Sequence, residues 1–215
     1  MNYDYDKWNN YTIGKVPWIN NRKNHLCREK FVDYVLNSSL KNILEVGAGE
    51  VIEGQRIRNL DKNINYSILD VSDTFLENAK KLGFSTFKGE MDNTPFSYKQ
   101  FDLIYLTSVL EHSPNIEKTF KEFRRISKNF YFTMFKWRMK SGGLKSSFHK
   151  KRKYFTSVFN IDKLLDLLSS YGSIKQLFVC TENGKVINFK EYRKKFNKID
   201  IHRNGNYLSI LGEYK

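Results

Sequence analysis

The stretch "KNILEVGAGEVIEGQRIRNL", residues 41–60, decides the fold of this chain. A short apolar run ends in glycine, a turn follows, and the sequence continues with helical spacing. This order is typical of a buried parallel strand that leads through a ligand-binding turn into a helix. The glycine pattern is incomplete, because Gly47 and Gly49 are followed by "EVI" and not by a third glycine.

Two phosphate-binding turns are excluded by this stretch. A P-loop requires a lysine directly after its last glycine, but Gly54 is followed by Gln55 and Arg56. A dinucleotide turn requires a third glycine where this chain has Ile52, and Glu50 would direct a carboxylate toward the pyrophosphate. The turn therefore favours a ligand that carries no phosphate.

S-adenosylmethionine is such a ligand, since it combines an adenosine, an amino acid and a sulfonium cation. Gly47 and Gly49 would permit the close backbone approach that its binding needs, and Glu45 would complement its positive charge. Asp70 ends the second predicted strand, where nucleotide-binding folds place the carboxylate that accepts hydrogen bonds from the ribose.

The rest of the chain alternates strand-like and helix-like segments. Apolar runs predict strands at 42–47, 64–70, 84–89, 101–108 and 129–135. Helical spacing predicts helices at 25–37, 55–60, 74–83, 115–127 and 160–172. Strand-like segments follow at 174–189, with a hairpin signal at Asn183–Gly184, and at 206–215. This alternation predicts an α/β fold, a mostly parallel sheet covered on both faces, with an antiparallel edge strand.

Four segments resemble class I S-adenosylmethionine-dependent methyltransferases of the small-molecule type: "LEVGAGE", "LDVS", "FKGEMDNTPFSYKQFDLIYLTSVLEH" and "EKTFKEFRRISKNFYFTMF". They follow one another in the family's order and spacing across residues 30–135. The resemblance implies a methyltransferase with a Rossmann-like, doubly wound, seven-stranded sheet. We expect one domain over 1–215, composed of an N-terminal arm or lid (1–30), a cofactor-binding half (31–135), a basic substrate-side insertion (136–160) and a C-terminal helix with edge strands (161–215).

The resemblance also implies contacts at the methionine end of the cofactor. Glu45, Gly47 and Gly49 would line this end, and the Leu106 backbone, after the fourth strand, would hold the cofactor's amino group. The alternative for Glu45 is a carboxylate at the end of a strand that faces solvent. The chain departs from the family where Val51 replaces the usual third small residue, which leaves the path of the loop open. A second departure, "SKN" in place of a Gly-Gly turn before the fifth strand, would alter a surface turn only.

At the nucleoside end, the resemblance implies that Asp70 accepts hydrogen bonds from the ribose hydroxyls and that Val71 lies against the adenine. Glu90 would meet the adenine amino group, with the Met91 backbone at the edge of the ring. Two alternatives stay open from the residues alone. Asp70 could cap the following helix, and Glu90 could be an ordinary loop acid.

Methyl transfer requires mainly positioning, and a base only when the acceptor is a hydroxyl or a protonated amine. His112 follows the fourth strand, where the methyl group should emerge, and is the candidate base. The alternative for His112 is a packing role at the start of a helix. In the N-terminal arm, Tyr5 and Tyr11 are the candidate lid contacts, and the alternative is an arm that simply packs on the core.

The formal net charge of +14 and the sequence pI near 9.6 favour an anionic partner. Residues 136–153 contain eight lysines or arginines and no acid. We expect a small-molecule or saccharide acceptor that is phosphorylated or nucleotide- or lipid-linked, with RNA as the alternative partner. Peripheral contact with a membrane would also suit this charge. Two further alternatives are a lysine content raised by an AT-rich genome and a binding module that has lost turnover.

The cysteine content and the hydropathy of the chain point to no further functional site. Cys27 and Cys180 are too few for a disulfide framework or a zinc site, so no metal is expected and a reducing cytoplasm is the expected compartment. The first ten residues lack the basic start and apolar run of a signal peptide. No run approaches the roughly 18 apolar residues of a membrane span.

Overall fold

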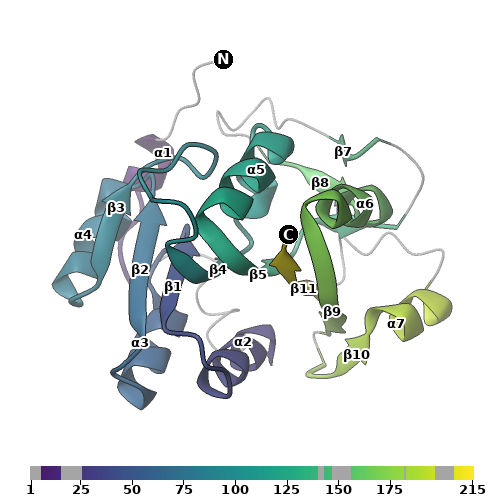
Figure 1. Cartoon of the computed structure of the whole chain (residues 1–215), viewed down its shortest axis with the longest axis horizontal. Coiled ribbons are helices and arrows are strands. Elements are labelled where there is room, and N and C mark those ends of the chain that lie inside the picture. Colours follow the sequence, from purple (N-terminus) through teal and green to yellow (C-terminus); the bar gives the residue numbers. More distant parts are fainter. Residues whose placement is uncertain (1–5, 16–25, 140–142, 147–155, 182, 197–205) are drawn as a thin grey trace.

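The computed structural model describes residues 6–15, 26–139, 143–146, 156–181, 183–196 and 206–215. Within them, an eight-stranded sheet has the order β10-β9-β11-β5-β4-β1-β2-β3 (Figure 1). Its strands are β1 (Asn42–Val46), β2 (Asn65–Asp70), β3 (Ser85–Lys88), β4 (Phe101–Thr107), β5 (Ser127–Met134), β9 (Gly172–Cys180), β10 (Val186–Asn188) and β11 (Tyr207–Tyr214).

Helices cover both faces of this sheet. They are α2 (Leu26–Leu36), α3 (Ile52–Leu60), α4 (Asp73–Lys81), α5 (Ile116–Ile126), α6 (Ile161–Tyr171) and α7 (Phe189–Lys195), with a short α1 (Asp6–Asn9) in the arm. The apolar side chains of α2, α3 and α4 pack in one cluster and those of α5 and α6 in another. Figure 1 shows α5 and α6 in front of the sheet, with α2 and α3 at the lower edge.

The direction of the strands confirms the α/β prediction. β3, β2, β1, β4 and β5 are parallel neighbours, which the crossover helices make possible. β11 is antiparallel to both β5 and β9, and β10 is antiparallel to β9 at the edge. The expected count of seven strands is wrong, because the hairpin after β9 adds β10 as an eighth.

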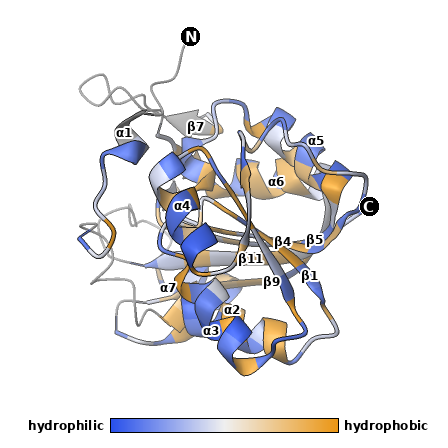
Figure 2. Ribbon diagram, turned by 90° about the vertical axis from the view of Figure 1, so that its left-hand side faces the viewer, coloured by the Kyte–Doolittle hydropathy of each residue, from blue (hydrophilic) through white to orange (hydrophobic). Residues whose placement is uncertain are grey.

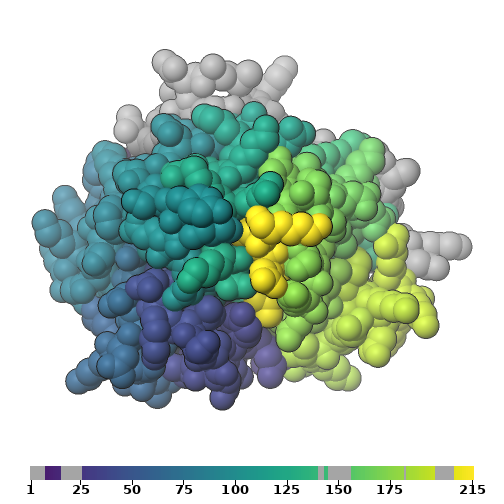
Figure 3. Space-filling view, in the orientation of Figure 1, coloured from purple at the N-terminus to yellow at the C-terminus, as the bar shows by residue number. Residues whose placement is uncertain are grey.

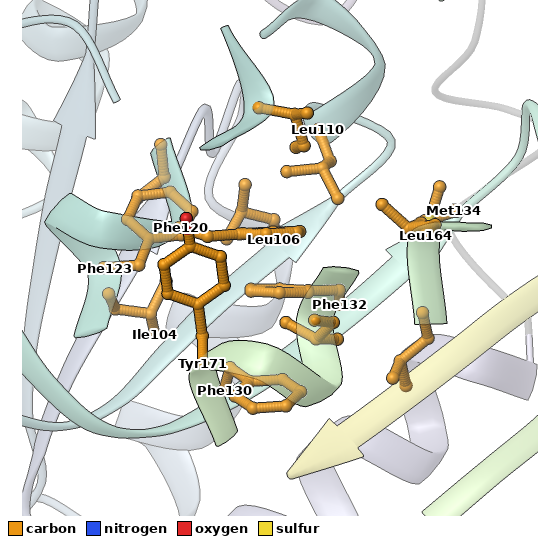
Figure 4. Packing of buried hydrophobic residues seen from close by; sticks show 14 of the residues in the cluster. Ile104, Leu106, Leu110, Phe120, Phe123, Phe130, Phe132, Met134, Leu164 and Tyr171 are labelled. Atoms are coloured by element: carbon orange, nitrogen blue, oxygen red, sulfur yellow. The ribbon is translucent and has the colours of Figure 1, made fainter. Parts of the chain in front are cut away.

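Alternating residues of the central strands fill the two clusters. In β4, Ile104 and Leu106 face the α5 side, whereas Leu103 and Tyr105 face the α2 side. Figure 4 shows Phe120 and Phe123 of α5 packed around the first pair. In Figure 2 the hydrophobic colouring is concentrated on the strands and on the inward sides of the helices. Burial on both faces explains why these strands read as continuous apolar runs.

Side-chain caps explain where several helices begin. Asn115 accepts a hydrogen bond from the Lys118 amide, and Asn160 accepts one from the Lys163 amide, at 3.1 and 3.2 Å. Gly83, with φ 82°, follows the end of α4 in the left-handed conformation that glycine tolerates best. The predicted boundaries of these helices are therefore correct to within two residues.

The region after β5 differs from the prediction. Three short strands, β6 (Trp137–Arg138), β7 (Lys145–Ser146) and β8 (Val158–Asn160), form a small separate sheet in the order β6-β8-β7. Most of the basic run 136–153 lies outside the described residues. The strand-like segment expected over 174–189 forms β9 and β10, which ends at Asn188. The helix α7 that follows was not predicted; it is capped by Asn188, which accepts from the Lys190 amide at 2.9 Å.

Candidate active site

A cavity of about 470 Å³ opens at the carboxyl ends of the parallel strands. Its walls come from the turn after β1, the ends of β2 and β4, the loops after β3 and β4, the start of the segment after β5, and the arm. Ligands of open α/β sheets bind at this end of the strands. The cavity therefore lies where the glycine turn predicts it.

The glycine turn has the backbone that its sequence requires. Gly47 and Gly49 have φ values of 67° and 57°, which glycine adopts without steric cost. A side chain at Gly47 would also collide with Val109, because its Cβ would lie 2.6 Å from Val109 Cγ2. At Gly49 no atom of the described residues lies within 4 Å of such a Cβ, so the position remains open toward the cavity.

The family's third small residue is replaced by a strained valine. Val51 precedes α3 in the left-handed region, with φ 56° and ψ 41°, and its side chain is fully buried. A β-branched residue seldom adopts this conformation. Gly54 makes room for it, since a Cβ at Gly54 would lie 2.8 Å from Val51 Cγ1 and 2.9 Å from the Tyr66 ring.

A buried charge network lies below the turn. Arg28 of α2 forms an ion pair with Glu53 of α3, and Tyr66 donates a hydrogen bond to Glu45 Oε2 at 2.9 Å. Arg28 and Glu45 also line the cavity. Burial, and then repulsion from Glu53, raise the pKa of Glu45 well above its ordinary value. A cationic ligand beside Glu45 would offset this cost of ionisation.

Asp70 ends β2 at the wall of the cavity and is 8% exposed. Burial raises its pKa to about 6, although the amides of Ser72, Val71 and Gly49 oppose the rise. Its Oδ1 accepts a hydrogen bond from the Ser72 amide at 2.9 Å. The residue that caps α4 is Ser72, which accepts from the Phe75 amide at 3.4 Å. Asp70 therefore binds the amide of the capping residue but is not itself the cap of the helix.

The other predicted residues divide into two groups. Val71, Glu90, Met91 and His112 line the same cavity as Glu45, Gly47, Gly49 and Asp70. Leu106 does not line it, because β4 runs to Thr107 and the Leu106 side chain is buried in the α5-side core. Thr107 and Ser108 form the wall at the end of β4 instead.

His112 and Glu111 end the loop after β4, in a short 3₁₀ turn, η1 (Leu110–His112). The His112 ring packs edge-on against Trp8, with centroids 5.1 Å apart. Glu111 is buried, and its Oε1 accepts hydrogen bonds from the amides of Phe135 and Lys136 at 3.0 and 3.1 Å. Glu111 thereby joins the loop after β4 to the end of β5.

The arm covers one side of the cavity. Its backbone docks on the start of α4, where Ser72 Oγ donates to the Trp8 carbonyl at 3.0 Å and Thr74 Oγ1 donates to the Asn9 carbonyl at 2.8 Å. Trp8 and Tyr11 are wall residues. Tyr5, the other expected lid contact, lies outside the described residues.

Several residues of the site have no signal in the sequence. Arg28 and Glu53 look like ordinary charges on helices, and Tyr66 like an ordinary strand aromatic. They become a network only when α2, α3 and β2 pack together. Glu111 could have been noticed, since it adjoins His112 in the predicted loop after the fourth strand.

A model of the family described as "Methyltransferase domain" matches residues 44–129, from β1 into β5. No curated protein matches the sequence. The matched range contains the glycine turn, Asp70, Glu90 and His112. Among the described residues, no helix has the length and apolarity to cross a membrane.

Solved structures of methyltransferases share the fold. A chain from the complex of the Haloferax volcanii Trm112 methyltransferase activator with a methyltransferase is 14% identical, with a TM-score of 0.70 over 100% of this chain and 99% of that one. A methyltransferase from Thermotoga maritima, described as a possible histamine N-methyltransferase, is 17% identical, with a TM-score of 0.61 over 92% and 93%.

A third similar structure is a methyltransferase from Aquifex aeolicus, 13% identical, with a TM-score of 0.59 over the whole of both chains. At these low sequence identities, the similar structures show only that the fold is shared. The evidence for a methyltransferase domain is the match of the family model to residues 44–129. Residues 44–129 therefore match the methyltransferase domain, and the chain as a whole has the fold of S-adenosylmethionine-dependent methyltransferases.

Proposed function

We propose that this chain transfers a methyl group to a small-molecule or saccharide acceptor that carries an anionic group. The observation that supports a site for the cofactor is the gathering of Glu45, Asp70 and Glu90 around one cavity beside an open glycine turn. S-adenosylmethionine supplies an electrophilic methyl group, activated by the sulfonium, to an attacking electron pair of the acceptor. The residues of the chain bind, orient and shield the reacting groups.

In the proposed arrangement, Asp70 accepts hydrogen bonds from the ribose and Val71 lies against the adenine. Glu90 takes the adenine amino group, with the Met91 backbone at the ring edge. The side chain of Asp70 suits this role because it is buried, lies at the end of β2 and faces three backbone amides that hold its orientation.

At the other end of the cofactor, Gly47 and Gly49 permit close approach, and Glu45 provides negative charge for the cationic methionine portion. We retain the backbone at Leu106 as the proposed contact for the amino group, although Thr107 is the neighbour that lines the cavity. Trp8 and Tyr11 of the arm would close over the bound cofactor.

His112 is the proposed base. Its ring lies in the wall of the cavity beside Trp8, on the loop that follows β4. A neutral imidazole there could accept a proton from the acceptor before or during transfer.

The anionic acceptor is supported by the net charge of +14 and by Lys136, which lines the cavity and begins the basic run. Lys136 Nζ donates a hydrogen bond to Thr156 Oγ1 at 2.6 Å, which holds the ammonium group in one place. The same charge favours the second candidate, RNA, whose phosphates would meet the basic run.

The cofactor assignment is tested by calorimetric titration with S-adenosylmethionine. We expect binding to the wild-type chain, a large loss of affinity in Asp70→Ala, and wild-type affinity in the matched control Glu77→Gln on the exposed face of α4. Unchanged affinity in Asp70→Ala would contradict the assignment.

The acceptor is tested with methyl-labelled cofactor and three substrate pools: phosphorylated sugars, nucleotide-linked sugars and RNA. Binding of RNA should weaken steeply as the salt concentration rises, in proportion to the phosphates contacted, whereas binding of a small acceptor should change little. Label in the RNA pool with a steep salt dependence would favour the second candidate.

A further inference from the structure

One oxygen of the Glu111 carboxylate has no hydrogen-bond partner in the part of the chain that the structure describes. Oε1 accepts hydrogen bonds from the amides of Phe135 and Lys136, as described above, and this fixes the carboxylate in place. Oε2 is fully buried and has no hydrogen-bond partner among the described residues. The whole residue is 2% exposed and forms part of the cavity wall.

A buried carboxylate oxygen without a donor is costly, and native structures seldom retain one without a functional reason. A second orphaned atom lies on the same loop. Ser108 Oγ is buried and has no hydrogen-bond partner within the described ranges, and the backbone of Ser108 has a φ of 55°, which is strained for a residue other than glycine. Both residues line the cavity, so the loop after β4 is built to meet a ligand.

The strand order separates this loop from the proposed nucleoside contacts. Asp70 follows β2 and Glu90 follows β3, on one side of β1, whereas Glu111 follows β4 and is tied to the end of β5, on the other side. Trp8, whose ring packs against His112, and Phe135, which follows β5, also line the cavity. Glu111 therefore lies at the end of the cavity that is away from the proposed nucleoside contacts.

We infer that Glu111 binds an amino group of the acceptor, so that the acceptor is an amine that also carries the anionic group. This inference rests on the proposed function. A buried carboxylate is best matched by an ammonium group, which supplies both charge and N–H donors. A phosphate or carboxylate of the acceptor would be repelled at Glu111 and is directed instead toward Lys136.

The test uses matched pairs of compounds that differ in a single amino or hydroxyl group. The probes are glucosamine 6-phosphate against glucose 6-phosphate, and 2-aminoethyl phosphate against 2-hydroxyethyl phosphate, titrated into the protein loaded with S-adenosylhomocysteine. We expect the amino member of at least one pair to bind about tenfold tighter, the value of a hydrogen bond to a charged group. Equal binding within both pairs would overturn the inference and leave a hydroxyl acceptor.

The variant Glu111→Gln keeps a carbonyl oxygen for the two amides and removes the charge. We expect it to abolish the preference for the amino member while the dissociation constant of S-adenosylhomocysteine stays unchanged. Glu117→Gln, on the exposed start of α5, is the control and should keep the preference. A preference that survives in Glu111→Gln would overturn the inference, whereas failure of the wild-type protein to bind S-adenosylhomocysteine would contradict the proposed function instead.

Discussion

Val51 and Gly54 occupy complementary space at the start of α3. The left-handed backbone at Val51 directs its side chain to where a Cβ at Gly54 would lie, 2.8 Å from Val51 Cγ1. The family's third small residue is thus absent at position 51, while a glycine three residues later makes the substitution sterically tolerable. We therefore expect the effects of substitutions at the two positions on the free energy of unfolding to be coupled.

We expect Gly54→Ala to destabilise the protein by about 1–3 kcal/mol, because its methyl group overpacks against Val51 and Tyr66. Val51→Ala in the same chain should recover part of this loss by removing Cγ1. Urea unfolding of the two single variants and the double variant measures the coupling. Strictly additive effects would show that the two residues do not share space.

We expect ionised Asp70 to lower the free energy of unfolding while it contributes to cofactor binding. Its folded pKa of about 6 lies above the ordinary value of about 3.9, so ionisation is disfavoured in the folded state. This penalty is absent below about pH 4, grows as the pH rises toward 6 and persists above it. Asp70→Asn should therefore raise the free energy of unfolding at pH 7 by on the order of 2 kcal/mol and give no gain at pH 4. An equal gain in the free energy of unfolding at both pH values would exclude the titration of Asp70 as the cause.

Binding of the cofactor should depend on pH through the same group. The ribose contact and the cationic sulfonium both favour ionised Asp70 and Glu45, whose pKa values are raised by burial. We expect affinity for S-adenosylmethionine to rise as the pH increases through about 6, with release of protons on binding. Calorimetry in buffers of different ionisation enthalpy measures this release, and Asp70→Asn should reduce it.

His112→Ala should retain cofactor binding but lose turnover by about 10²–10⁴-fold if the imidazole acts as a base. Turnover is measured on the acceptor that the labelling experiment identifies, with cofactor affinity measured in parallel. His112→Phe preserves an aromatic surface against Trp8 and separates packing from proton transfer. Wild-type turnover in either variant would remove the base role.

Deletion of residues 1–20 should weaken cofactor binding by about tenfold, since Trp8 and Tyr11 would no longer cover the cavity. The double variant Trp8→Ala and Tyr11→Ala should reproduce most of this loss without changing the backbone contacts to α4. Tyr98→Ala, an aromatic that is 74% exposed, is the control. A deletion that leaves the dissociation constant unchanged would mean that the arm only packs on the core.

The sequence predicted the parts of this molecule that local chemistry determines. Gly47 and Gly49 require an unusual backbone and Asp70 ends an apolar run, so each could be read without knowing its neighbours. The role of Arg28 could not be predicted in this way, because it depends on an ion pair with Glu53, a residue of another helix. The path of the turn at Val51 was also hidden, since it depends on the burial of the Val51 side chain in the cluster shared by α2, α3 and β2.

The position of β11 has a consequence for how the chain is made. β11 enters between β5 and β9, and Figure 3 shows the C-terminal end of the chain, in yellow, between teal and green segments. The Lys215 amide donates to the Tyr171 carbonyl, and Arg124 Nε donates to the Lys215 carbonyl. During synthesis on the ribosome, β5 and β9 both emerge before β11, and each presents an open edge until it arrives. The nascent domain therefore passes through a stage that is prone to intermolecular strand pairing, in which a chaperone would be most useful.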